Sequence, residues 1–203
     1  MQNRRSSSLE KTKVLVGMAI FTALVVVLQL IAGVIKIGAF SPSLVLIPIV
    51  IGAASYGWKS GVWLGGVFGL VVLIGCITGT DIGGNMMWNY NAAVTALICM
   101  VKGIAAGALA GLAYQALQKK NQILATVAAA VVCPVVNTGL FTIGAVAVFK
   151  PVLLKWAEAN GYVDDLLAYI FLGMIGVNFL IEVGINLVLS PVIVRVLKIK
   201  KIV

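Results

Sequence analysis

One stretch decides the fold class: residues 14–35 read VLVGMAIFTALVVVLQLIAGVI. Among these 22 residues only Thr22 and Gln29 interrupt the apolar run. About 20 apolar residues suffice for a helix to cross the hydrocarbon core of a bilayer. The run is too long for the apolar part of a signal peptide, and we find no small-residue cleavage site in it. We therefore expect a retained membrane-spanning helix.

The composition extends this interpretation to the whole chain. Of the 203 residues, 62% are hydrophobic and 10% are charged, whereas soluble domains are about half apolar and about a quarter charged. A protein of this size exposes too much surface to bury such an excess in one core. The composition therefore predicts an all-α membrane protein, because helices satisfy their own backbone hydrogen bonds in lipid.

Five further apolar segments follow the first. They cover residues 43–55, 61–78, 92–117, 123–149 and 166–194. The second is short, at 13 residues, so we expect it to be tilted or partly interfacial. Residues 79–91 and 150–165 are polar enough to predict loops. We predict one domain of six transmembrane helices over residues 14–194, a cytoplasmic basic arm at 1–13 and a cytoplasmic basic tail at 195–203.

The basic residues predict the orientation in the membrane. With both termini in the cytoplasm, 11 of the 15 Lys and Arg residues lie inside and three lie outside, namely Lys36, Lys150 and Lys155, while Lys102 lies within a span. This bias satisfies the positive-inside rule. We therefore expect a multi-pass protein of the bacterial plasma membrane. The net charge of +9 comes from basic residues at the ends of the predicted spans, where they set the orientation. We therefore expect no nucleic-acid partner.

Several absences from the sequence argue against an enzyme. The chain contains no histidine, which removes the commonest general base and a favoured metal ligand. It also lacks the GxxxxGK[ST] phosphate loop of many ATPases. Cys76, Cys99 and Cys133 lie in apolar segments, and we interpret them as small buried residues. We predict no catalytic residue, no metal site and no cofactor in this chain.

Small residues recur at four-residue spacing in three of the predicted spans. They are Ala19 and Ala23, then Gly61, Gly65 and Gly69, then Gly103, Gly107 and Gly111. On a helix this spacing forms one smooth stripe, which lets a neighbouring backbone approach closely. We interpret the glycine stripes as internal packing. The alanine pair fits either packing or an external docking face.

Polar residues within the spans are candidates for binding, because polar groups are costly in hydrocarbon. In the last span, Asn178, Glu182 and Asn186 recur every four residues and so share one face. Asn137 comes three residues after Pro134, and a kink there would turn it toward a cavity. The alternative for Asn137 is a hydrogen bond to a neighbouring helix.

Two further candidates have more than one interpretation. Lys102 lies at a depth similar to that of Glu182. The two residues therefore form an ion pair that clamps helices, or contact a ligand, or do neither. The predicted loop before residue 92 ends in WNYN, which comprises Trp88, Asn89, Tyr90 and Asn91. Rings that stack and amides that hydrogen-bond suit a flat polar molecule. Aromatic residues also gather at membrane interfaces without any binding role.

The chain resembles the S component, the substrate-binding membrane subunit of an energy-coupling factor (ECF) transporter. The resemblance rests on the length, the six predicted spans, the basic arm and the lack of an ATPase motif. It rests also on Ala19-Ile20-Phe21-Thr22-Ala23, which matches the Ala-x-x-x-Ala docking pattern of the family's first helix. The family implies partners, namely a transmembrane coupling subunit that Ala19 and Ala23 would dock, and two ATPase subunits.

The resemblance also implies a substrate and a site. The family binds a vitamin or similar micronutrient at its outer face, which makes this chain a riboflavin-, pantothenate- or similar heterocycle-binding subunit. By position, the substrate-binding residues would be Trp88, Asn89, Tyr90, Asn91, Asn137, Asn178 and Glu182. The alternatives are a stand-alone ion-coupled transporter or small channel, with Lys102 and Glu182 as a relay, and a scaffold subunit without a ligand.

Overall fold

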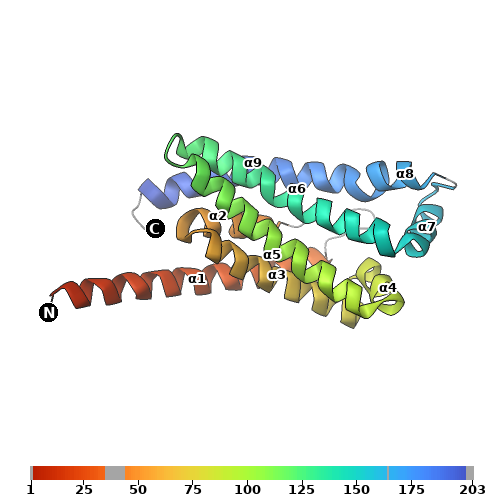
Figure 1. The fold of residues 1–203 in the computed structure, drawn as a ribbon, viewed down its shortest axis with the longest axis horizontal. Coiled ribbons are helices and arrows are strands. Elements are labelled where there is room, and N and C mark those ends of the chain that lie inside the picture. The colour runs from red at the N-terminus through yellow and green to blue at the C-terminus, as the bar shows by residue number, and fades with distance from the viewer. Residues whose placement is uncertain (1, 35–43, 164, 200–203) are drawn as a thin grey trace.

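A computed structural model gives the structure of the protein, which is described for residues 2–34, 44–163 and 165–199. These residues form helices and contain no strand (Figure 1). Four helices are long and apolar enough to cross a membrane, over Glu10–Ala32, Trp58–Thr78, Ala92–Leu117 and Gln122–Val148. The protein is therefore an all-α membrane protein.

The helices follow the predicted segments closely. In order they are α1 (Gln2–Val34), α2 (Leu46–Tyr56), α3 (Trp58–Thr78), α4 (Ile82–Tyr90), α5 (Ala92–Leu117), α6 (Gln122–Val148), α7 (Lys150–Ala159), α8 (Leu166–Ala168), the π-helical segment η1 (Tyr169–Gly176) and α9 (Val177–Ile199). The last three follow one another without a break and cover the sixth predicted segment, residues 166–194. The short apolar helix α2 corresponds to the second predicted segment, residues 43–55.

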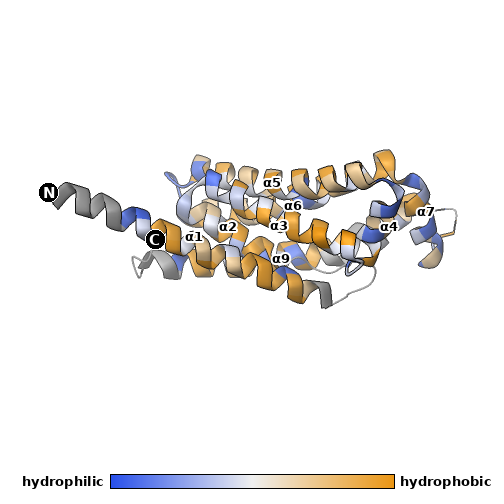
Figure 2. Ribbon diagram, turned by 90° about the horizontal axis from the view of Figure 1, so that it is seen from below, coloured by the Kyte–Doolittle hydropathy of each residue, from blue (hydrophilic) through white to orange (hydrophobic). Residues whose placement is uncertain are grey.

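The long helices run along one axis and give the molecule two distinct ends (Figure 1). The start of α1, the α2–α3 turn, the α5–α6 turn and the end of α9 lie at one end, which we call the basic end because it carries Lys59, Lys119 and Arg195. α4, α7 and α8 lie at the other, which we call the α4–α7 end. Apolar residues dominate the long helices between the two ends (Figure 2).

A seam of glycines joins α3 to α5. The two helices are antiparallel, so Gly61 faces Gly107 and Gly65 faces Gly103. A Cβ at any of these four positions would collide with the carbonyl oxygen of the facing glycine. Gly69 continues the seam opposite the backbone of α5, with the Cα of Met100 3.1 Å from the position that its Cβ would take. The interpretation of both glycine stripes as internal packing is confirmed.

Two predicted loops are instead largely helical. Within residues 79–91, Asp81 starts α4 by accepting a hydrogen bond from the backbone N–H of Gly84 at 3.0 Å. Within residues 150–165, α7 has a proline in its first turn, where the missing N–H of proline is tolerated. The prediction of continuous loops at these positions was wrong, because both helices are short and amphipathicity alone does not distinguish them from polar connections.

α4 and α7 pack together at their end of the molecule. A second core lies there, formed by buried residues such as Met87, Phe149, Leu153 and Tyr169. The indole N–H of Trp156 on α7 also lies 3.1 Å from the sulfur of Met86 on α4. The two helices therefore cover the ends of α5, α6 and η1.

Candidate functional site

A stripe of buried polar side chains runs along α9. Glu182, Asn186 and Ser190 are spaced by four residues, and their exposed fractions are 6%, 1% and 0%. The side-chain amide of Asn186 donates to the backbone carbonyl of Glu182 at 2.9 Å. Asn186 Oδ1 and Ser190 Oγ are buried and have no hydrogen-bond partner within the described part of the chain. The side chain of Asn178, one turn earlier, lies outside the described residues.

α6 carries a further buried polar side chain. Asn137 is 5% exposed, and its Oδ1 has no hydrogen-bond partner among the residues that the structure describes. Cys133, one turn before it, lies within electrostatic range of Glu182. α6 and α9 pack against each other, and Asn137 lies one turn along α6 from Cys133, the residue within electrostatic range of Glu182.

Lys102 lies between aromatic rings in the middle of the bundle. Its ammonium is 4.9 Å from the ring centroid of Phe141 on α6 and 5.7 Å from that of Phe68 on α3. A cation over an aromatic face gains about 0.5–2 kcal/mol. Lys102 is ten residues into α5, or about 15 Å at 1.5 Å per residue, so it lies near the middle of a hydrocarbon core about 30 Å thick.

Lys102 and Glu182 act on different parts of the bundle. Lys102 lies within electrostatic range of Cys76 and Cys99, and Glu182 lies within range of Cys133. Lys102 contacts the ring of Phe141 on α6. Cys133 and Phe141 are eight residues apart along this helix, or about 12 Å. The structure thus places the two charges at different levels of α6, and their pairing stays a prediction.

The four WNYN residues do not share one environment. Trp88 is half-buried and packs against the main hydrophobic core, which is formed by buried residues such as Val50, Leu64 and Ala106. Asn89 is exposed, and Tyr90 is 52% exposed with its ring 5.7 Å from that of Phe149. Asn91 caps α5 by accepting a backbone N–H bond at 3.1 Å. Of these four residues, Trp88 is the one that packs against the main core, and the binding role of the set stays a prediction.

The alanine pair of α1 lies on an uncovered face. Ala19 and Ala23 are both exposed, and only 6% of the apolar window of α1 is buried. Trp63 of α3 contacts the helix close by, where its indole N–H donates to Thr22 Oγ1 at 3.1 Å. The alanine face is thus open to lipid or to another protein, and docking through it stays a prediction.

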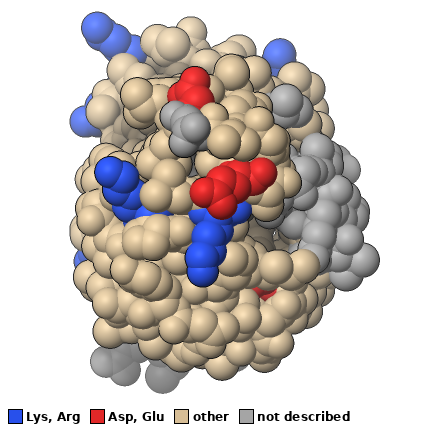
Figure 3. All heavy atoms as spheres, turned by 90° about the vertical axis from the view of Figure 1, so that its right-hand side faces the viewer, with Lys and Arg blue, Asp and Glu red and all other residues tan. Residues whose placement is uncertain are grey.

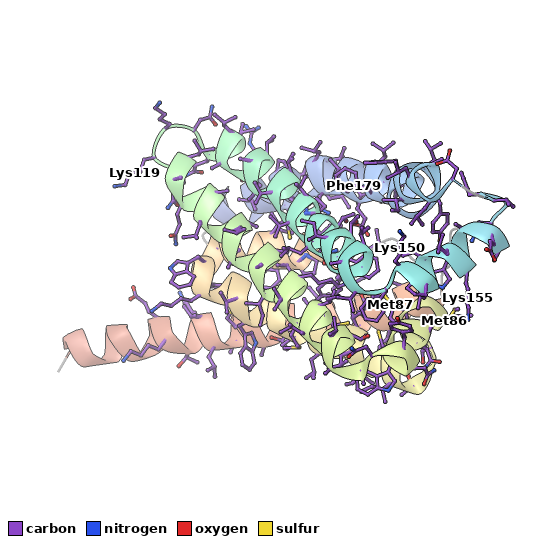
Figure 4. All side chains as sticks on the ribbon, turned by 45° about the vertical axis from the view of Figure 1, so that its right-hand side comes forward. Met86, Met87, Lys119, Lys150, Lys155 and Phe179 are labelled. Carbon is purple, nitrogen blue, oxygen red and sulfur yellow. The ribbon has the colours of Figure 1, made fainter. Side chains whose placement is uncertain are left out.

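Two surface features complete the description of the ends. A pocket of about 410 Å³ opens at the basic end. It is lined by Val14, Ala53, Ala54, Ser55, Tyr56, Gly57, Tyr114, Gln115 and Gln118. At the opposite end, lysines and acidic side chains lie side by side (Figure 3), and Lys150 and Lys155 are found there, far from Lys119 (Figure 4).

Comparison with known families identifies this arrangement. A sequence model of the substrate-specific component of ECF transporters matches residues 13–194. The chain belongs to this family. No curated protein and no solved structure matches it. The resemblance inferred from sequence is thereby confirmed, and the protein is a multi-pass membrane subunit that gives an ECF transporter its substrate specificity. Membership implies association with the transmembrane and ATPase subunits of an ECF module.

The structure adds residues to this S component that the sequence analysis missed. Ser190 extends the polar spacing of the last span, and the four-residue rule would have found it from Asn186. Phe68 and Phe141 surround Lys102, but they come from different helices, so no local pattern indicates them. The paired helices α6 and α9 and the Lys102 cluster both bring polar groups into the interior of this S component.

Proposed function

We propose that this S component binds a small water-soluble vitamin, or a related heterocycle, and delivers it inward together with an ECF module. The observation that carries the proposal is the set of buried polar side chains on α6 and α9, two helices that pack together, in a chain that belongs to a family of substrate-specific components. Buried acceptors without partners are costly in an apolar environment. Among the residues that the structure describes, Asn137 and Asn186 each supply one such oxygen, and hydrogen-bond donors of a bound heterocycle would satisfy both.

The proposed topology has six passes with both termini in the cytoplasm. α2 and the continuous α8–η1–α9 segment would supply the two passes beyond the four long apolar helices. The basic end would then face the cytoplasm under the positive-inside rule, and the α4–α7 end would receive the substrate. We place the protein in the bacterial plasma membrane on the same rule.

The chain itself would perform no catalysis. ATP hydrolysis would belong to two ATPase subunits, and a transmembrane coupling subunit would connect them to this chain, with Ala19 and Ala23 as its docking face. We propose that no metal or cofactor takes part within this subunit. Substrate contacts would come from Asn137, Asn178 and Glu182 in the helices, with Trp88, Asn89, Tyr90 and Asn91 at the outer end.

The test combines native mass spectrometry with transport. The full chain is purified from its source membrane with its partners, and bound masses are recorded. It is then placed in proteoliposomes alone, or with the ECF module and ATP, and uptake of the compound found is measured. We expect a co-purifying vitamin-sized mass, and uptake only with the module and ATP. Uptake by the chain alone that an uncoupler abolishes would instead establish the stand-alone ion-coupled transporter.

A further inference from the structure

The environment of Lys102 has a feature that packing does not explain. The ammonium lies near mid-membrane, and within the described part of the chain the partners that the structure gives it are the rings of Phe68 and Phe141. Rings attract a cation through their quadrupole but do not neutralise it. Packing against these rings does not require a positive charge, because a neutral residue of similar length could fill the same space.

Two carboxylates, Asp81 and Glu182, are the candidates for an ion pair with Lys102, and each has another position or role. Asp81 acts on the same two cysteines as Lys102, but its carboxylate accepts the backbone N–H of Gly84 at the start of α4. Glu182 lies within electrostatic range of Cys133, which is about two helical turns along α6 from Phe141, one of the two rings at Lys102. A buried cation in a membrane protein generally has an anionic partner or marks a substrate path.

The side chains around Lys102 are mixed in character. Lys102 and Phe141 are half-buried, whereas Phe68 is 1% exposed. The three side chains come from α5, α6 and α3 respectively, so a molecule bound there would contact three helices. The cluster offers one positive charge for an anion and two aromatic faces for an adjoining apolar or ring portion.

We infer that Lys102 binds a carboxylate group of the transported compound, and that Phe68 and Phe141 contact its apolar part. This inference rests on the proposed function and narrows it to carboxylate-bearing substrates. Neutral heterocycles and cationic vitamins are excluded as the preferred class. Lys102 is then the specificity-determining residue, since it supplies the charge that distinguishes an acid from its neutral analogue.

Pairs of probes that differ only at the carboxylate test the inference. The full chain in lipid nanodiscs is titrated calorimetrically with pantothenate and panthenol, biotin and biotinamide, and nicotinate and nicotinamide. Riboflavin and thiamine extend the panel to compounds without a carboxylate. We expect one acid to bind at least tenfold more tightly than its neutral partner, which corresponds to about 1.4 kcal/mol.

Substitutions then assign the preference to one residue. Lys102→Met should remove the preference for the acid, and Lys102→Arg should retain a measurable part of it because the charge remains. Lys119→Met is the matched control, since it removes the same charge from an exposed site at the basic end. Monodisperse elution and an unchanged helical circular dichroism spectrum show that each variant is folded.

The outcomes separate the inference from the function on which it rests. Tightest binding of riboflavin, thiamine or a neutral partner would overturn the inference and leave the proposed function intact, and so would an acid preference that survives Lys102→Met. If the folded chain bound none of the eight probes, and native mass spectrometry also found no vitamin-sized ligand, the proposed function itself would fail.

Discussion

The glycine seam between α3 and α5 makes a quantitative prediction about stability. Gly65→Ala adds a methyl group against the carbonyl oxygen of Gly103, and the new Cβ would lie 3.3 Å from the Cα of Ile104. Backbone atoms cannot rotate aside as a side chain can, so the two helices must separate. Overpacking of this kind typically destabilises a protein by about 1–3 kcal/mol.

A matched substitution isolates this effect. Gly139→Ala also adds a methyl group within a long helix, but its Cβ would meet nothing within 4 Å. Alanine is favoured over glycine in a helix by about 1 kcal/mol, so this variant should keep or slightly raise the melting temperature. The two substitutions therefore differ mainly in whether another backbone faces the new methyl group.

Thermal unfolding in detergent, followed by a thiol-reactive fluorophore, provides the assay. The three cysteines are buried in the folded chain, so fluorescence reports their exposure on unfolding. A destabilisation of 2 kcal/mol corresponds to about 4–8 °C in melting temperature for a chain of 150–250 residues. We expect Gly65→Ala to melt lower than Gly139→Ala by this amount. Equal melting temperatures for the two variants would refute the seam as a close backbone contact.

A double substitution tests the geometry further. Gly65 and Gly103 face each other across the same contact, so helices separated by one methyl group have already made room for the second. Gly65→Ala combined with Gly103→Ala should therefore lower the melting temperature by less than the sum of the two single effects. A strictly additive result would show that the two positions act independently.

Three further predictions concern docking, binding and the outer helix. Ala19→Trp or Ala23→Trp should abolish co-purification with the ECF module and leave ligand binding intact, and unchanged co-purification would remove the docking role of this face. Asn178→Ala and Glu182→Ala should each weaken ligand binding at least tenfold, about 1.4 kcal/mol, in calorimetric titrations, and normal affinity in both folded variants would place the pocket elsewhere. Asp81→Ala should destabilise α4 by about 1 kcal/mol through loss of its N-cap, detectable as faster amide hydrogen exchange over Ile82–Tyr90, and unchanged exchange would contradict the capping role.

The long helices were predictable because their sequence signal is strong and local. α5 begins at residue 92 and ends at 117, as the apolar segment predicted. α4 was missed because nine residues with Gly83 and Gly84 in the first turn have little intrinsic helicity. The capping residue Asp81 was a usable signal, since Asp is favoured directly before a helix.

The candidate site was predictable only in part. A four-residue spacing correctly indicated that Glu182 and Asn186 share a buried face of one helix. It could not show that Phe68 and Phe141 approach Lys102, because that contact joins three helices distant in sequence. The sequence also did not indicate that the Asn91 side chain accepts a capping hydrogen bond at the start of α5, because capping depends on where the helix begins.

The sparse contacts of α1 bear on how the protein is made. Its apolar window has a mean hydropathy of 2.7, above the 2.2, 1.9 and 2.0 of the windows in α3, α5 and α6. Translation releases α1 before the others, so it enters the membrane when no partner from this chain yet exists. A strongly apolar helix with few small residues facing a neighbour can be stable in the membrane without a partner helix. α3 lacks this independence, because its glycine face stays unmatched until the ribosome has completed α5.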